Sequence, residues 1–158
     1  MTNTPNTFMA RAIALSLENV QQGKGGPFGA VIVKDTQIIA EGANSVTATN
    51  DPSAHAEIVA IRAACRRLKN FELQDCEIYS SCEPCPMCLG AIYWARPARV
   101  YFANLAREAA QAGFDDAFIY DEIKQPFSRR KIPMIRLALD GALTAFRAWQ
   151  EQGNKILY

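Results

Sequence analysis

The sequence lacks any apolar run that approaches the ~20 residues needed to span a bilayer. Residues 1–8 are polar and do not form the basic-then-apolar pattern of a secretion signal. A strong basic excess is also missing, since 17 Lys and Arg stand against 16 Asp and Glu, for a formal net charge of +1. Proteins that bind long polyanions usually carry such an excess. These absences predict a cytoplasmic protein that binds no membrane and does not have nucleic acid as its partner.

The five cysteines do not suit a disulfide framework. Their number is odd, and no secretion signal accompanies them. Cys82, Cys85 and Cys88 fall within one stretch of seven residues, whereas Cys65 and Cys76 are expected to be ordinary small core residues. This crowding needs a chemical explanation, and a metal site is the first candidate.

The order of the expected elements is that of an α/β protein. The chain has 158 residues, which fits one domain, residues 1–158. Periodicity and turn residues predict helices and strands in this order: helix 7–22 ending at Gly23, strands 28–34 and 37–44 around Asp35-Thr36, helix 53–68 or 55–68, strand 75–80, helix 86–95, strand 99–103, helix 105–112, strand 133–139 and helix 142–152. The strand–helix–strand crossover at residues 75–103 implies a parallel pair. We therefore expect a three-layer α/β/α sandwich around a five-stranded mixed sheet.

Two short segments carry the chemistry. His55 begins one helix, two residues before Glu57, and Cys85 and Cys88 begin another helix. Residues three apart on a helical turn point the same way, and a helix N-terminus favours the thiolate form. One imidazole and two thiolates give three zinc ligands and leave the fourth tetrahedral position open, as in catalytic zinc sites.

Glu57 has a different expected role from the three ligands. Residues two apart in a regular helix point to nearly opposite sides, so His55 must lie in the turn that leads into the helix. The segment Asp51-Pro52-Ser53 supplies breaking and capping residues for such a turn. Glu57 can then take a proton from a zinc-bound water and deliver it to a leaving nitrogen.

These residues have three other interpretations. His55 is the sole histidine, and a lone histidine is often only a satisfied polar residue. Cys85 and Cys88 have the spacing of a redox pair, although no thioredoxin-like context precedes them. Cys82 lies three residues before Cys85 and could close a structural site as a fourth ligand, although Glu83-Pro84 turns the chain between them.

The combined H-x-E and P-C-x-x-C pattern resembles that of the cytidine-deaminase-like superfamily of zinc nucleobase deaminases. Further segments resemble bacterial guanine deaminases in particular, and together the resemblance covers about residues 26–158. These segments are PFGA at residues 27–30, NDP at 50–52, PCPMCLGAIYWARP at 84–97, AGFDD at 112–116 and FIY at 118–120.

The resemblance implies a three-layer fold, one zinc ion per subunit, and conversion of guanine to xanthine and ammonia by zinc-bound hydroxide that attacks C2. It implies Glu57 as the proton shuttle. It also implies a homodimer in which about residues 140–158 are exchanged between subunits. The residues that it implies for substrate binding are Phe28, Asn44, Ala56, Asp116 and Tyr158.

Three rival functions remain open at this point. A tRNA adenosine deaminase shares the zinc motifs, but it should carry a basic surface for RNA, and only residues 66–67 and 129–131 are basic clusters here. A guanosine deaminase needs room for ribose. A non-catalytic zinc module predicts a closed site in which Glu57 has no function.

Overall fold

The computed structural model describes residues 4–158; residues 1–3 of the polar N-terminal stretch lie outside the described residues. The chain divides into two compact units, of which the first ends at Asp116 and the second is Ala117–Tyr158. The first unit contains the sheet and all the residues that line a cavity of about 210 Å³.

The sheet has four strands in the order β2-β1-β3-β4. Their bounds are β1 Gly29–Lys34, β2 Gln37–Ala43, β3 Cys76–Cys82 and β4 Arg99–Asn104. β1 runs antiparallel to both β2 and β3, whereas β3 and β4 are parallel, as the crossover predicted. Asp35 and Thr36 join β1 to β2 with φ of 49° and 60°, the left-handed pair typical of a tight hairpin turn. The mixed sheet is therefore confirmed.

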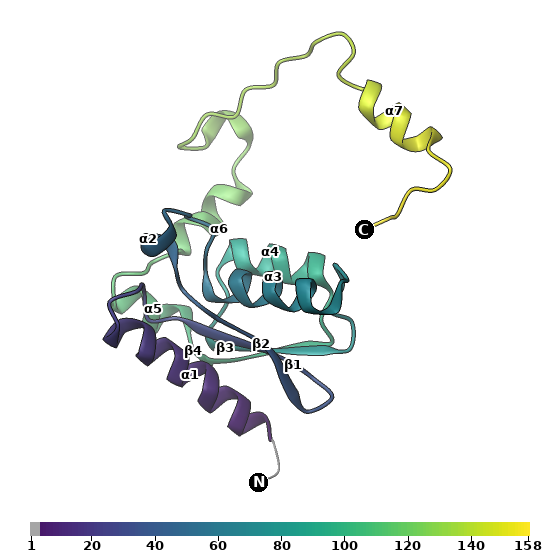
Figure 1. Ribbon diagram of the computed structural model, residues 1–158. Coiled ribbons are helices and arrows are strands. Elements are labelled where there is room, and N and C mark those ends of the chain that lie inside the picture. The colour runs from purple at the N-terminus through teal and green to yellow at the C-terminus, as the bar shows by residue number, and fades with distance from the viewer. Residues whose placement is uncertain (1–3) are drawn as a thin grey trace. The chain divides into compact units, whose positions relative to one another are not determined.

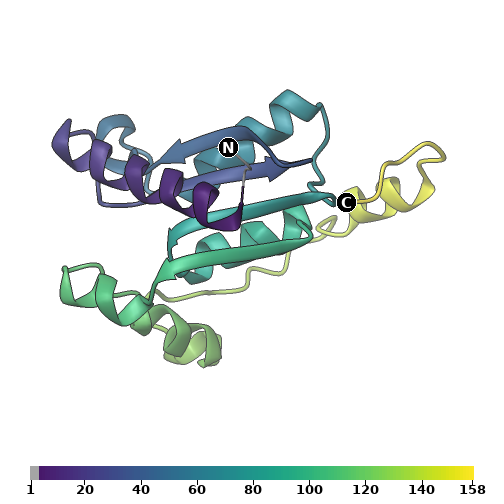
Figure 2. The same ribbon diagram turned by 90° about the horizontal axis from the view of Figure 1, so that it is seen from below.

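Helices cover both faces of this sheet, as the α/β/α prediction requires (Figure 1). The helix α1 (Pro5–Gln21) packs on one face, and α3 (Ala56–Leu68) and α4 (Pro86–Ala95) pack on the other. Figure 2 shows the four strands from the side of α1. The alternation of side chains along β1 and β3 divides the core into two clusters. Ile32 and Ile78 point toward α3 and α4, whereas Val31 and Tyr79 point toward α1.

The two outer layers approach the sheet at glycines. A Cβ added to Gly42 of β2 would lie 2.3 Å from the Ala56 carbonyl oxygen, at the start of α3. A Cβ added to Gly29 of β1 would lie 2.4 Å from the Ala12 carbonyl oxygen of α1. The approach at Gly42 brings the beginning of α3, and the residue before it, against the sheet, and the approach at Gly29 does the same for α1.

Two short helices of the first unit lie near the ends of strands. These are α2 (Val46–Thr49), which the sequence did not predict, and α5 (Ala106–Gln111), which it did. Four residues in one turn are too few to produce a recognisable helical period, which is why α2 was missed.

The second unit contains α6 (Ala117–Lys124), the 3₁₀ turn η1 (Phe127–Arg129) and α7 (Thr144–Glu151). The predicted strand at residues 133–139 is wrong in this structure, so the sheet of the described residues has four strands instead of five. The reason is physical: an extended segment becomes a strand only when a partner strand pairs with its backbone, and residues 117–158 contain none.

Across residues 4–158, none of the helices combines the length and apolar character that crossing a membrane requires.

Candidate active site

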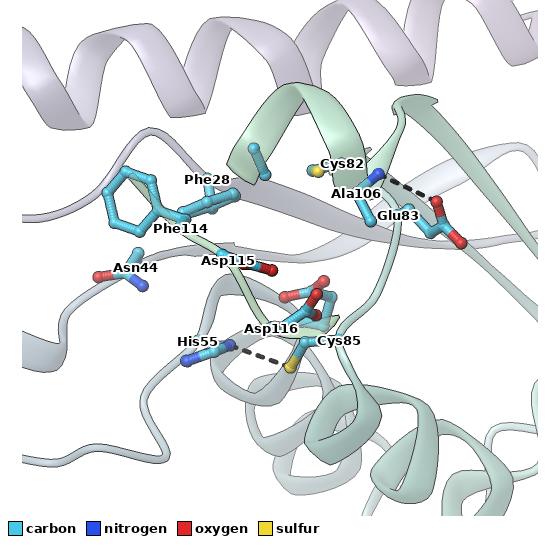
Figure 3. A pocket seen from close by; sticks show the side chains of 12 residues that line it. Phe28, Asn44, His55, Cys82, Glu83, Cys85, Ala106, Phe114, Asp115 and Asp116 are labelled. Carbon is cyan, nitrogen blue, oxygen red and sulfur yellow. Dashed lines mark hydrogen bonds between the residues drawn. The ribbon is translucent and has the colours of Figure 1, made fainter. Parts of the chain in front are cut away.

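A cavity of about 210 Å³ opens in the first unit between the sheet and the helix N-termini (Figure 3). Its walls come from β-strand ends, from the starts of α3 and α4, and from the segment that follows α5. The lining residues are Phe28, Asn44, His55, Glu57, Cys82, Glu83, Cys85, Ala106, Ala109, Phe114, Asp115 and Asp116.

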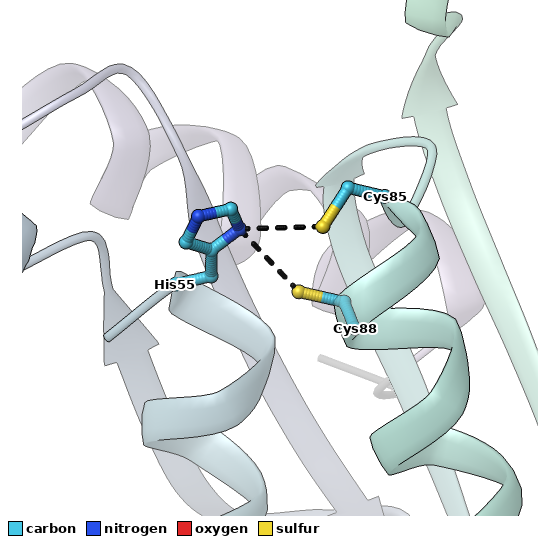
Figure 4. Close-up of side chains that lie close together, drawn as sticks. All are labelled: His55, Cys85 and Cys88. Atoms are coloured by element: carbon cyan, nitrogen blue, oxygen red, sulfur yellow. Dashed lines mark hydrogen bonds between the residues drawn. The ribbon is translucent and has the colours of Figure 1, made fainter. Parts of the chain in front are cut away.

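Three metal-ligating side chains meet beside this cavity, and two of them, His55 and Cys85, line it. His55 and Cys85 are the residues that precede α3 and α4, both with extended backbone, and Cys88 lies in the first turn of α4. The Nδ1 atom of His55 faces both sulfurs, at 3.5 Å from the Sγ of Cys85 and 3.5 Å from the Sγ of Cys88 (Figure 4). The predicted position of His55, in the turn that leads into its helix, is therefore confirmed.

The turn before His55 is formed by Asp51, Pro52 and Ser53, residue types that favour turns. The Asp51 carboxylate accepts hydrogen bonds from the Ser53 backbone N–H at 2.8 Å and from the Ser53 hydroxyl at 2.6 Å. The His55 N–H then donates to the Ser53 carbonyl at 2.8 Å. This turn joins α2 to α3 and fixes the direction from which His55 reaches the cavity.

The three side chains fit zinc. A tetrahedral zinc ion with typical Zn–N and Zn–S bonds separates nitrogen from sulfur by about 3.6 Å, close to the two distances observed. All three ligand atoms lie within 4.8 Å of one another. Among the described residues, this group contains three ligands, which is the number found in catalytic zinc sites with an open position.

The local electrostatics favour a thiolate at Cys85. Hydrogen bonds from the Cys88 thiol and from His55 lower the pKa of Cys85 to about 4, against the opposing effect of burial. The hydrogen bond to Cys85 and burial raise the pKa of Cys88. The pair therefore releases one proton readily, and a cation placed between the two sulfurs favours release of the second.

Glu57 lies beside this group without being part of it. Its side chain is buried, at 6% exposure, and its Oε2 atom lies 3.5 Å from the Cys88 sulfur. The Ser80 hydroxyl donates to its Oε1 atom at 3.2 Å. Burial raises the pKa of Glu57, which brings this carboxyl group closer to neutrality than an ordinary glutamate.

Cys82 does not join the three ligands. Its thiol donates to the Leu105 carbonyl oxygen at 3.8 Å, and the group of ligand atoms does not include it. Burial raises its pKa to about 11, so it remains a protonated thiol at neutral pH. The alternative of a closed structural site with Cys82 as the fourth ligand is therefore not supported.

The residues expected to bind substrate are only partly brought together. Phe28, Asn44 and Asp116 line the cavity. Ala56 is fully buried in the core cluster, and its side chain is not among those that line the cavity. Tyr158 belongs to the second unit, so its role stays a prediction.

Several lining residues were not singled out from the sequence. Phe114 packs edge-on against Phe28, with ring centroids 5.0 Å apart and planes at 87°. Asp115 lies next to Asp116, and the Glu83 carboxylate accepts a hydrogen bond from the Ala106 N–H at 3.0 Å. Phe114 and Asp115 could have been found, because they sit inside the AGFDD segment on which the family resemblance rests.

Comparison with known proteins agrees with this geometry. Residues 2–104 match the model of the cytidine and deoxycytidylate deaminase zinc-binding region. The chain is 57% identical to the guanine deaminase of Bacillus subtilis, over 96% of this chain and 97% of that protein. It is similar to the X-ray structure of the guanine deaminase from Bacillus subtilis with a TM-score of 0.96 and 56% identity, over 98% of this chain and 99% of the other.

A tRNA-specific adenosine deaminase of Aquifex aeolicus is a more distant relative, with 46% identity over 52% of this chain and 54% of that protein. The matched region 2–104 contains the three grouped ligands, His55, Cys85 and Cys88, and the carboxyl group of Glu57 beside them. The chain thus belongs to the cytidine and deoxycytidylate deaminase zinc-binding family and is a zinc-dependent aminohydrolase.

Proposed function

We propose that this protein is a guanine deaminase, which hydrolyses guanine and water to xanthine and ammonia. The observation that carries the proposal is a buried carboxyl group, Glu57, beside an open three-ligand zinc site in a small cavity. The near-full-length similarity to a guanine deaminase supports guanine over other amino-substituted bases.

The size and walls of the cavity suit a free base. At about 210 Å³ it is smaller than the roughly 300–1,000 Å³ of pockets that hold drug-sized ligands, which favours guanine over guanosine with its ribose. Phe28 and Phe114 provide aromatic surface for the flat faces of a purine. Asp115 and Asp116 supply carboxylate oxygens, which accept hydrogen bonds from the N–H groups of guanine.

Glu57 is the proposed acid and base. Zinc held by His55, Cys85 and Cys88 would supply Lewis acidity that makes water nucleophilic at neutral pH. Glu57 takes a proton from the attacking water and gives it to the exocyclic nitrogen at C2, so that the nitrogen leaves as ammonia. The Ser80 hydroxyl holds Oε1 of Glu57 during this exchange, which leaves Oε2 for the proton.

Asp116 has a supporting role in this proposal. Its carboxyl group lies at the cavity wall, where burial and the nearby Cys85 raise its pKa. A hydrogen bond from a guanine N–H to this oxygen is stronger there than in water. This interaction would orient C2 toward the zinc site.

The proposed reaction is tested by the origin of the oxygen in the product. Zinc-loaded protein incubated with guanine in ¹⁸O-labelled water is expected to give xanthine with one labelled oxygen, together with an equal amount of ammonia. The label would be located by mass spectrometry of the isolated product. Release of ammonia without labelled xanthine would contradict hydrolysis at C2.

We also propose a homodimer in which about residues 140–158 are exchanged between subunits. The proposal is supported by the composition of the second unit, whose large apolar side chains are mostly exposed. Examples are Ile135 at 79%, Leu137 at 79%, Leu157 at 73% and Tyr158 at 72% exposure. Soluble proteins rarely leave so many large apolar side chains open to water, and a second copy of the chain would cover them.

Mixing two inactive variants tests the exchange. A chain with Glu57→Gln has an intact tail, and a chain that lacks Tyr158 has an intact Glu57. If tails are exchanged, the mixed dimer combines an intact Glu57 with the partner's Tyr158, and co-expression is expected to restore turnover to about one site in each mixed dimer.

Each variant expressed alone is the control and is expected to have little activity, with zinc still bound. If the mixture is as inactive as the two parents while mixed dimers are present, each tail serves its own subunit. If loss of Tyr158 leaves the kinetics unchanged, the tail has no part in the site.

A further inference from the structure

A buried asparagine in α1 stands where the helix would be expected to carry an apolar residue. The buried residues of α1 are Phe8, Ala12 and Asn19, which share one face of the helix. Phe8 packs against Tyr79, at 5.3 Å between ring centroids. Asn19 is only 5% exposed, and its amide needs hydrogen-bond partners that an apolar residue would not.

The Asn19 amide nitrogen donates to two backbone carbonyls far apart in sequence. One is Gly26 in the loop before β1, at 2.9 Å, and the other is Asn44 at the end of β2, at 2.8 Å. The Gly26 N–H in turn donates to the side-chain Oδ1 of Asn44 at 3.3 Å. These bonds close a triangle of three residues, Asn19, Gly26 and Asn44, which we call the asparagine triangle.

The loop lies tightly against this triangle. A Cβ added to Gly25 would lie 2.3 Å from the Asn44 carbonyl oxygen and 3.1 Å from the Asn19 amide nitrogen. No side chain other than hydrogen fits there without displacing the asparagine triangle. Glycine at this position therefore allows the loop backbone to reach both asparagines.

The triangle fixes which end of the Asn44 amide faces the cavity. Its Oδ1 atom accepts from Gly26 N–H and, at 3.4 Å, from Val46 N–H. The amide nitrogen of Asn44 is consequently on the side of the other lining residues, as Figure 3 shows. Asn44 thus offers hydrogen-bond donors to the cavity, opposite in kind to the acceptors of Asp115 and Asp116.

We propose that Asn19 is a positioning residue for substrate binding, which acts through Asn44 by holding its amide with the donor end toward the substrate. The proposal rests on the proposed function, in that the substrate is taken to be a base with a ring nitrogen or carbonyl acceptor on the edge that meets Asn44. Asn19 itself is remote from the reacting atoms, because it does not line the cavity.

Removal of the two Asn19 donors is expected to weaken substrate binding more than it slows chemistry. In Asn19→Leu, which keeps the volume but lacks the donors, we expect KM for guanine to rise about tenfold or more, the effect of losing one oriented hydrogen bond. We expect kcat to change by less than about threefold, because the zinc ligands and Glu57 lie at or just before the starts of α3 and α4, away from α1. Asn19→Asp also removes the amide donors and places a buried carboxyl oxygen against the two carbonyl oxygens, so KM should rise at least as much as in Asn19→Leu.

Two controls separate positioning from loss of stability. Phe8→Leu alters the same buried face of α1 but no part of the asparagine triangle, so it should lower Tm and leave KM unchanged. Asn44→Ala removes the group through which Asn19 acts. The double variant Asn19→Leu/Asn44→Ala is therefore expected to have the KM of Asn44→Ala alone.

Steady-state kinetics of these variants, combined with hydrogen exchange at the Gly26 and Val46 amides without substrate, is the deciding experiment. Faster exchange at both amides in Asn19→Leu or Asn19→Asp, with a higher KM and no additivity with Asn44→Ala, supports the proposal. An unchanged KM, or effects that add in the double variant, would overturn it. If the wild type does not turn over guanine, the proposed function fails. The role of Asn19 is then decided by the exchange rates and by the dissociation constants of adenine, guanosine and 8-azaguanine for the same variants.

Discussion

Glu57→Gln protein is expected to bind zinc normally and to lose turnover of guanine by about two to four orders of magnitude, the range that a positioned proton donor and acceptor contributes. The substitution keeps the shape of the side chain and an oxygen that can accept the Ser80 hydroxyl. It removes only the capacity to take up and release a proton. Steady-state kinetics and metal analysis of the same preparation measure the two effects together.

The fold should tolerate this change. Glu57 is a buried carboxyl group whose pKa burial raises, so the neutral amide avoids the cost of desolvating a charge. We expect Tm of Glu57→Gln to be equal to or above that of the wild type. Glu108→Gln is a matched control, because Gln still accepts the Leu105 N–H at the start of α5 and the residue lies outside the cavity lining. If Glu57→Gln retained wild-type turnover, Glu57 would not be the proton shuttle.

Cys88→Ala protein is expected to lose bound zinc, activity and a large part of its stability. The Cys88 side chain is fully buried and faces His55 Nδ1, so its loss removes one of three ligands and leaves a void beside them. Binding of zinc to the folded chain adds to its free energy of unfolding, and weaker binding withdraws that contribution. Metal analysis should give much less than one zinc per chain, and Tm should fall and become insensitive to added chelator.

Cys82→Ala is the matched control for this prediction. Cys82 is also a buried cysteine at the same cavity, but its thiol donates to Leu105 O and it is outside the ligand group. We expect Cys82→Ala to retain one zinc per chain and to lose only the small contribution of its packing and weak hydrogen bond. Loss of zinc from Cys82→Ala, with retention in Cys88→Ala, would reverse the assignment of ligands.

The catalytic centre could be predicted from the sequence because its geometry is local. The two cysteines share one helical turn, and the Asp51-Pro52-Ser53 segment determines where His55 leaves the preceding turn. The sequence does not show that the starts of α3 and α4 lie side by side. That follows from the order of the sheet, which places β1 between β2 and β3.

Other parts of the structure depend on contacts that leave no local pattern. Asn19 and Ser80 act on residues 25 and 23 positions away, respectively, and neither lies in a recognisable motif of its own. Ser80 could have been suggested by alternation along β3, which puts it on the same face as Ile78, toward α3. Asn19 could be suspected only once its helix face was known.

At residues 133–139 the error is of the opposite kind, because the local pattern predicts a strand that the structure does not contain. Its composition is that of a strand, but pairing requires a partner at the right place, and the sequence does not identify one. Likewise, the roles of Asp116 and Tyr158 came from the family resemblance, and neither residue type in its own surroundings predicts contact with a base.

The central claim is most directly tested by ammonia release from guanine, guanosine, adenine, adenosine and cytosine, measured side by side with the zinc-loaded wild-type protein. Rapid release from guanine, with slow or no release from the other four, is the predicted result. Rapid release from guanosine would mean that the site admits a ribose, against the argument from cavity size. No release from any of the five, together with deamination of adenosine in tRNA, would contradict the assignment of guanine as substrate.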